Sequence, residues 1–202
     1  MRPTFRKLSG YAIVTTLSAL LLPACSTNIS RTTTRPEPNE SIIVFGVKPD
    51  NARLSLFPGE IVDGKFKQNV LLDTFAKIHD VPSNGYVTAK VKTGQALALT
   101  SVQMSINGTL WGPQFSFCNN PKLLSFEVPS GKIAYAADIE FVQVGNVLRP
   151  RVTQDIESAR KHIKESYPNL TDELVPLDLQ LIPASRCEGP APQTINVYVP
   201  GR

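Results

Sequence analysis

The sequence predicts a mainly β fold, an antiparallel β-sandwich with one amphipathic helix in its C-terminal half. Its turn signals are the first observation behind this prediction. Pairs of turn-forming residues, nearly all beside β-branched or aromatic runs, occur at Asp63-Gly64, Asn84-Gly85, Thr93-Gly94, Asn107-Gly108, Ser130-Gly131 and Gly145-Asn146. Short strands separated by such turns are typical of antiparallel sandwiches and barrels rather than of alternating βαβ units.

Alternation of apolar and polar residues is the second observation. In 132–142, apolar side chains occupy every second position, while Asp138 and Glu140 fall on the opposite face. This period of two is expected for a half-buried strand. The apolar residues of 124–128 predict the preceding strand, and we expect 129–131 to close the two strands into a hairpin.

Three further segments complete the predicted strands. In 95–106 the parity of the apolar positions changes midway, and a β-bulge near Thr100 and Ser101 would restore a common face. Leucines at every second position of 177–181 predict a late strand. The segment 70–81 fits either a short helix or a strand.

One helix is predicted over 155–167. Its buried face is defined by apolar residues at helical spacing, namely Ile156, Ala159, Ile163 and Tyr167. Acidic residues occupy the first turn, where they interact favourably with the positive end of the helix dipole, and Pro168 ends the pattern. We expect Glu157 and Lys161 to form an i,i+4 pair, and His162 to be a solvated helix residue.

The N-terminus has the pattern of an export signal. A cationic start is followed by an uncharged apolar run of 15 residues over 8–22, and Leu22-Pro23-Ala24 then leads directly to Cys25. This motif resembles the lipobox of bacterial lipoproteins, in which the signal, here 1–24, is removed and the cysteine is lipidated. The alternatives are an ordinary cleaved signal and an uncleaved membrane helix, although a spanning helix needs about 20 residues. In lipoproteins of diderm bacteria, a residue such as Ser26 in place of aspartate after the cysteine implies sorting to the outer membrane, and we expect the domain to face the periplasm.

The formal net charge of +4 largely reflects this signal. Residues 1–24 contain three cationic side chains and no acid, so the chain from Cys25 onwards carries about +1. It has no basic stripe with interleaved aromatics, and we therefore predict no nucleic-acid binding. Membrane attachment is expected to come from acyl chains instead of surface charge.

Cysteine use fits an oxidising compartment. With Cys25 assigned to lipid, Cys118 and Cys187 remain, and disulfides form and persist beyond the inner membrane. A bridge between them is the favoured interpretation, and closing a loop of about 70 residues would contribute roughly 4 kcal/mol. The alternative is two unrelated buried thiols. A redox-active or metal-binding pair is disfavoured because the spacing is not C-x-x-C.

The remaining chain divides into three parts. Residues 25–40 carry the lipidated cysteine and a polar, proline-containing tether that cannot bury enough apolar surface to offset its ordering entropy. About 15 flexible residues would hold the domain about 20 Å from the lipid. Residues 41–188 form the β-sandwich domain, and 189–202 form a proline-rich C-terminal tail.

Three blocks of the sequence carry a resemblance. They are Gly85-Tyr86-Val87 with Lys92-Thr93-Gly94, then 126–135 with Asp138-Ile139, then 159–168. Together they resemble small uncharacterised bacterial lipoproteins with a prealbumin-like or carboxypeptidase-regulatory-like sandwich. The resemblance covers about half of the chain and consists of turn glycines and core aromatics. It implies a fold and a compartment, but no activity and no catalytic residues.

Residues that could carry chemistry are few. His79 with Asp80 or Asp73 and a serine could form a hydrolase arrangement, but no G-x-S-x-G elbow fixes a nucleophile. Asp138 and Glu140 at i,i+2 could chelate calcium or form an acid/base pair, although the solvated face of a strand normally carries such charges. We therefore predict no enzyme activity, no catalytic or cofactor-binding residue, no cofactor and no metal site.

The sequence thus favours a binding or structural role. The leading hypothesis is a membrane-anchored envelope lipoprotein that holds a protein partner through an exposed strand edge or a set of loops. The alternative is a small-ligand or glycan binder that uses Trp111, although a single tryptophan after a hairpin turn is more often a partly buried core residue. A hydrolase that uses His79 is the third hypothesis.

Overall fold

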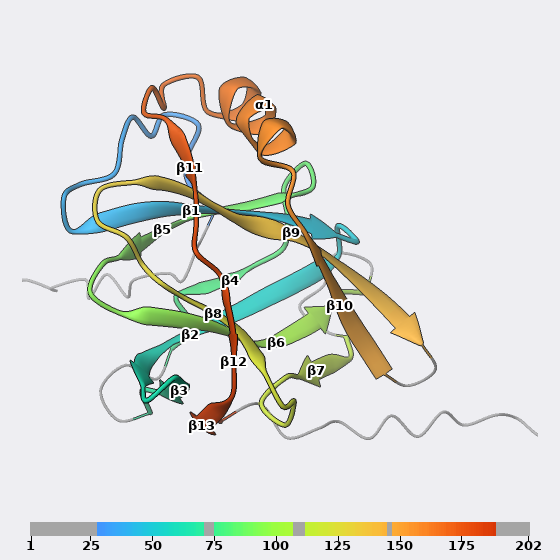
Figure 1. Cartoon of the computed structure of the whole chain (residues 1–202). Helices are drawn as coiled ribbons and strands as arrows, with labels where there is room; N and C mark the ends of the chain where they lie inside the picture. The colour runs from blue at the N-terminus through green and yellow to red at the C-terminus, as the bar shows by residue number, and fades with distance from the viewer. Residues whose placement is uncertain (1–27, 71–74, 107–111, 145–146, 189–202) are drawn as a thin grey trace, which may run out of the picture.

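The computed structural model describes residues 28–70, 75–106, 112–144 and 147–188 (Figure 1). Two β-sheets pack face to face, and the single helix described lies on the outer side of one of them. The elements are β1 (Glu40–Lys48), β2 (Ala52–Val62), β3 (Lys65–Gln68), β4 (Ile78–Asp80), β5 (Tyr86–Lys92), β6 (Ala96–Met104), β7 (Gln114–Ser116), β8 (Leu123–Glu127), β9 (Ile133–Val144), β10 (Val147–Thr153), α1 (Ile156–Ser166), β11 (Leu174–Pro176), β12 (Gln180–Ile182) and β13 (Ala184–Arg186). The predicted mainly β, sandwich-like fold is confirmed.

The strand order of the two sheets shows how the chain is distributed. The first sheet has the order β10-β9-β1-β5, with β11 also paired to β9. The second has the order β12-β8-β6-β2-β3-β13, with β4 paired to β2 and β7 paired to β6. Most pairs are antiparallel, but β1 and β9 run parallel at the centre of the first sheet. Parallel neighbours need a long connection, and here the chain visits the second sheet between them.

The predicted hairpin between 124–128 and 132–142 is wrong. Strand β8 pairs with β6 and β12 in the second sheet, whereas β9 lies in the first sheet. The connection bonds to the start of β1 instead of closing a hairpin: the Gly131 N–H donates to the Glu40 carbonyl, and the Ser41 hydroxyl donates to the Pro129 carbonyl. Turn residues at this point predict a reversal of the chain, but they do not specify that the flanking strands pair.

Two other predicted turns are tight hairpin turns. Asp63 and Gly64 have φ values of 50° and 68° and connect β2 with β3. Asn84 and Gly85 have φ values of 53° and 79°, and the residues on either side exchange two backbone hydrogen bonds. Positive φ at both central positions suits Asn, Asp and Gly. The predicted turns at 107–108 and 145–146 lie outside the described residues.

The bulge predicted near Thr100 and Ser101 is confirmed. Ser55 lies opposite Ser101 and Leu56 opposite Leu99, so Thr100 is the extra residue of β6. An extra residue changes the parity of every later position on the strand. Apolar side chains before and after Thr100 therefore reach the same core.

Strand β9 contains a second register shift, at Ala136, that the sequence analysis missed. Residues 132–142 were expected to place their apolar positions on one face. Instead, Ile133 and Tyr135 face the helix side, whereas Ile139 and Phe141 face the other sheet. The run of alanines around the shift fits either face, so the alternation gives no sign of it.

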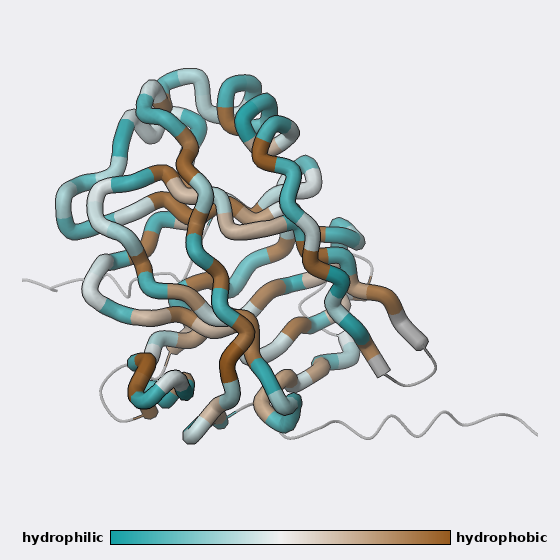
Figure 2. Tube along the Cα trace, viewed as in Figure 1, coloured by the Kyte–Doolittle hydropathy of each residue, from teal (hydrophilic) through white to brown (hydrophobic). Residues whose placement is uncertain are grey.

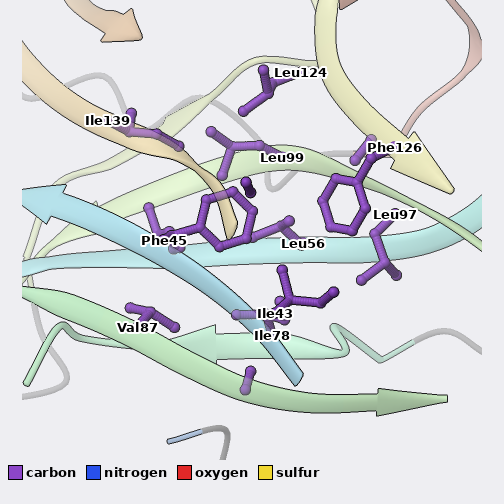
Figure 3. Packing of buried hydrophobic residues seen from close by; sticks show 14 of the residues in the cluster. Ile43, Phe45, Leu56, Ile78, Val87, Leu97, Leu99, Leu124, Phe126 and Ile139 are labelled. Atoms are coloured by element: carbon purple, nitrogen blue, oxygen red, sulfur yellow. The ribbon is translucent and has the colours of Figure 1, made fainter. Parts of the chain in front are cut away.

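The buried side chains form two clusters, and Figure 2 shows hydrophobic residues along the strands of both sheets and in the helix. The larger, the inter-sheet core, contains Phe45 and Phe126, whose ring centroids lie 5.9 Å apart (Figure 3). The smaller, the helix-side cluster, consists of Ile42, Val44, Ile133, Tyr135, Ala159, Ile163, Tyr167, Leu170 and Leu174. Strand β1 contributes to both clusters, which explains its nearly continuous apolar sequence.

Helix α1 confirms the predicted helix. Asp155 caps it by accepting hydrogen bonds from the Ser158 N–H and hydroxyl at 3.1 and 2.7 Å. Two details differ from the prediction. Glu157 pairs with Arg160 instead of Lys161, and His162 is only 8% exposed. The ring of Tyr86, the first residue of β5, stacks on His162, a tertiary contact that helical spacing alone does not predict.

The predicted late strand over 177–181 is wrong for 177–179, which connect β11 to β12, and right only for 180–181, which lie in β12. Strand β11 pairs with β9 in the first sheet, and β12 pairs with β8 in the second, so this segment runs from one sheet to the other (Figure 1). Leu177 is buried, but Leu181 is 59% exposed. Part of the ambiguous segment 70–81 is the strand β4.

The predicted tether also differs from expectation. From Asn28 to Asn39, the described part of 25–40 lies along the domain and is hydrogen-bonded to it at several points. Ile29 packs against the helix-side cluster. The predicted signal, Cys25 and the tail 189–202 lie outside the described residues.

Candidate functional site

An apolar cavity of about 320 Å³ opens at one side of the sandwich. We call it the apolar slot. It lies where β10, the edge of the first sheet, meets β8 and β12 of the second, and it is lined by Leu99, Phe117, Asn120, Lys122, Leu123, Leu124, Ile139, Pro150, Val152 and Leu181. Its inner wall is the inter-sheet core, because Ile139, Leu99 and Leu124 belong to both.

Two large apolar side chains are exposed at the slot. Leu181 of β12 is 59% exposed and Val152 of β10 is 40% exposed. Each comes from a different sheet, and both line the cavity. Singly exposed apolar residues are common on protein surfaces, but two that border an apolar cavity are typical of a binding surface.

The strand edges around the slot are poor templates for adding a partner strand. Among the described residues β10 pairs only with β9, and Pro150 in its middle has no N–H to donate. Arg149 and Arg151 flank this proline, and such charged, proline-containing edges resist pairing. Strand β12 has only three residues. The slot, rather than the backbone edge, is therefore the feature that could hold a partner.

Cys118 and Cys187 lie at disulfide distance, with Cα atoms 5.3 Å apart. Cys118 follows Phe117, whose ring stacks on Phe141 at a centroid distance of 6.2 Å. Phe117 also lines the apolar slot. A bridge at this point would tie the segment that follows β13 to the wall of the slot.

His79 does not form the suspected hydrolase arrangement. Its Nδ1 lies 2.9 Å from the Ser55 hydroxyl across the β2–β4 pair, but Ser55 is only 2% exposed. The Asp80 carboxylate accepts hydrogen bonds from Asn28 instead of orienting His79, and Asp73 lies outside the described residues. Burial, followed by the charge of Arg53, lowers the pKa of His79. This pair is a cross-strand hydrogen bond without access for a substrate.

The two candidate carboxylates on β9 do not converge. Asp138 accepts a hydrogen bond from the Tyr135 hydroxyl at 2.8 Å, and Glu140 is ion-paired with Arg151. The Tyr135 hydroxyl also accepts the Asp155 N–H, so it connects the sheet to the start of α1. Within the described ranges, no cluster of three or more His, Cys, Asp or Glu side chains could hold a metal ion.

A second, polar cavity of about 400 Å³ lies between α1 and the turn before β5. Tyr86 and His162 line it and stack with ring centroids 4.1 Å apart. The Nδ1 of His162 lies 3.3 Å from the Ser166 hydroxyl, and its Nε2 is buried with no partner among the described residues. Burial lowers the pKa of His162 and so favours the neutral ring. Arg31 and Lys161 add positive charge, and Glu165 adds negative charge.

Sequence reasoning missed both cavities. One signal was present: Arg149-Pro150-Arg151 in a strand pattern indicates an edge strand. The leucines of 177–181 indicated burial, so the exposure of Leu181 could not be foreseen. Trp111, the predicted aromatic platform, lies outside the described residues. Among these residues, no helix is long and apolar enough to cross a membrane.

Comparison with protein-family models, with characterised proteins and with solved structures finds no match to this chain. The resemblance to small lipoproteins with a prealbumin-like sandwich therefore stays a prediction, and the functional conclusions rest on the residues themselves.

Proposed function

We propose that this protein is a lipid-anchored lipoprotein of the outer membrane, facing the periplasm, that binds a protein partner at the apolar slot. The export pattern ending in Cys25 and the residue Ser26 support the anchor and the compartment. The observation that carries the binding role is the slot itself, an apolar cavity bordered by exposed Leu181 and Val152. Binding rather than catalysis is proposed, because the Ser55–His79 pair has no access for a substrate.

The charges around the slot indicate the chemistry of the partner. Lys122 lines the cavity. Arg149 and Arg151 lie on β10, but they alternate with the slot-lining Pro150 and Val152 and so point to the other face, where Glu140 neutralises Arg151. An extended protein segment with an apolar side chain beside acidic residues would fill the cavity and complement this surface. The partner would then be held by side-chain insertion rather than by a long added strand.

A photo-crosslinking residue at Leu181, in intact cell envelopes, tests the proposal. Val62 gives a matched control, because it is also a strand residue of the second sheet and is 45% exposed. We expect one discrete protein adduct from position 181, none of the same size from position 62, and loss of the adduct in Val152→Asp. Equal labelling from both positions, or an adduct that survives Val152→Asp, would refute binding at the slot.

Charge provides a second readout of the same experiment. Lys122→Glu should weaken the adduct, because it reverses the charge in the cavity lining. An adduct of unchanged yield would exclude acidic flanks on the partner.

Substitution of Cys25 by Ser should abolish acyl labelling and membrane attachment. Normal attachment of that variant would refute the lipoprotein assignment.

Binding of a small polar ligand or glycan is the second candidate function. The stacked Tyr86 and His162, with a buried nitrogen at the wall of a polar cavity, favour it. Soluble disaccharides of the cell-wall type should then shift the amide NMR signals of the 84–86 turn and of α1. Tyr86→Ala should remove the shifts. Signals that do not move at millimolar ligand would exclude this site for glycans.

A further inference from the structure

Asn28 attaches the N-terminal segment to the domain through a set of specific hydrogen bonds, which we call the Asn28 clamp. Its backbone N–H and its Nδ2 both donate to Asp80 Oδ2, at 3.0 and 2.9 Å. Its Nδ2 also donates to the Val81 carbonyl at 3.0 Å, and its Oδ1 accepts the Thr88 N–H at 2.9 Å. The side-chain amide thus acts as donor and acceptor at once, which an aspartate or leucine cannot reproduce.

The residues after Asn28 reinforce the clamp. The Ile29 N–H donates to the Thr88 carbonyl at 2.8 Å, and the Ile29 side chain packs against the helix-side cluster. Arg31 Nε donates to the Ser166 carbonyl at the end of α1. Asn28 also forms a β-bridge with Ala89, so the segment lies against the β5 edge of the first sheet.

The clamp leaves very little chain between the domain and the predicted lipid. Three peptide units separate Cys25 from Asn28, and consecutive Cα atoms are about 3.8 Å apart, so the two Cα atoms are at most about 11 Å apart. A flexible tether of about 15 residues would have allowed about 20 Å on average, and any orientation of the domain. With these hydrogen bonds formed, both the distance between the domain and the lipid and the orientation of the domain are restricted.

We infer that the Asn28 clamp holds the β5 edge of the first sheet against the bilayer, so that the apolar slot faces away from the membrane. This inference rests on the proposed lipidation of Cys25. The slot lies at β10, and the order β10-β9-β1-β5 places it at the opposite edge of the same sheet. Three strand spacings put about 14 Å between the two edges. The surface facing the lipid is therefore the one around the clamp and the 83–85 turn.

Resonance energy transfer on the full-length lipidated protein, reconstituted into phosphatidylethanolamine–phosphatidylglycerol vesicles with an acceptor dye on the lipid headgroup, tests this orientation. A donor dye is placed either at Ser83, two residues from Val81 in the clamp, or at Arg149 on β10. Both positions are exposed. We expect clearly higher transfer from Ser83 than from Arg149. Equal transfer from the two positions in normally acylated protein would overturn the inference.

Asn28→Asp should remove this difference in transfer. The change keeps the size of the side chain, but it deletes the Nδ2 donor and places a second carboxylate beside Asp80. Asn39→Asp is the matched control: it makes the same change in the same segment at an exposed side chain, and it should keep the difference. A difference that persists in Asn28→Asp would refute the role of the clamp.

A longer connection between Cys25 and Asn28 provides a variant that leaves the clamp and the fold intact. Insertion of about ten Gly and Ser residues after Thr27 keeps the Asn28 contacts but extends the reach to the lipid. The difference in transfer between Ser83 and Arg149 should fall as it does in Asn28→Asp. A difference as large as in the wild type would show that the short connection between Cys25 and Asn28 does not set the orientation. Acyl labelling and vesicle flotation are measured on every variant. Loss of either in the wild type would reject the lipoprotein assignment, whereas normal values with equal transfer reject only the orientation.

Discussion

Replacing both Cys118 and Cys187 with serine should destabilise the protein without changing its fold. The two residues are 69 positions apart in the sequence, with Cα atoms 5.3 Å apart. In the chain-entropy model, a cross-link that closes a loop of this length lowers the entropy of the unfolded chain by an amount worth roughly 4 kcal/mol at 25 °C. We expect the fold to survive, because Phe45, Phe66 and Phe126, the fully buried aromatic residues of the inter-sheet core, lie on β1, β3 and β8.

The loss of stability should be greatest at the C-terminal end of the domain. Strands β11, β12 and β13 have three residues each, so few ladder hydrogen bonds hold this section. Hydrogen exchange should therefore accelerate in 174–188 before it accelerates in the long strands β2 and β9. A uniform acceleration across the domain would show that the bridge supports the whole core instead.

Denaturant unfolding of protein exported behind a cleavable signal measures the effect. The midpoint of the double variant should fall, and the reduced wild type should unfold at the same midpoint, because both lack the same cross-link. Mass spectrometry of freshly isolated, alkylated protein gives the oxidation state. Two free thiols in that sample, or equal midpoints for oxidised and reduced wild type, would refute the bridge.

Three further outcomes are expected. Tyr135→Phe should cost about 1 to 3 kcal/mol in denaturant unfolding, because it removes a buried hydroxyl that joins Asp138 to the Asp155 N–H; an unchanged midpoint would contradict this role. Burial lowers the pKa of His162 from its usual 6.5, so the unfolded chain takes up a proton first as the pH falls. Below about pH 6.5 this residue should reduce stability by at most about 1.4 kcal/mol per pH unit until its folded pKa is passed, and His79, whose pKa is also lowered, should add to the decline. Thermal unfolding at several pH values tests this, and His162→Gln should reduce the slope. Radiolabelled palmitate should label the wild type but not Cys25→Ser, and labelling of both would place the lipid elsewhere.

The sequence predicted the local features of the fold well and the pairing of its strands poorly. Turn type, the bulge at Thr100 and the helix over 156–166 depend on residues close together in the chain, which is why pattern and propensity sufficed. The assignment of β8 and β9 to different sheets depends on which distant strand each one meets. Within β9, the apolar side chains change from one face of the sheet to the other at Ala136. The alanines around that position leave the apolar pattern unbroken, so the sequence gives no sign of the change.

The binding surfaces were harder to predict for the same reason. The apolar slot is formed by side chains from β6, β8, β9, β10 and β12, and among these strands only β10, with its Arg-Pro-Arg sequence, carries a local signal. The Asn28 clamp was missed because the segment 26–40 has the composition of a disordered linker. Composition measures how much apolar surface a segment can bury, but one asparagine with four matched hydrogen bonds can fix a polar segment in place.

The clamp and the slot lie at opposite edges of one sheet, about 14 Å apart, and share no residue. Changes at sites this far apart, without shared partners, are normally additive. Asn28→Asp should therefore leave the affinity of the purified protein for a partner segment free in solution unchanged. For a partner fixed in the envelope, the orientation of the slot sets the effective concentration, and the same variant should then alter crosslinking from Leu181. A changed affinity in solution would mean that the N-terminal segment shapes the slot directly. The clamp would then affect partner binding itself, and not only the orientation of the domain on the membrane.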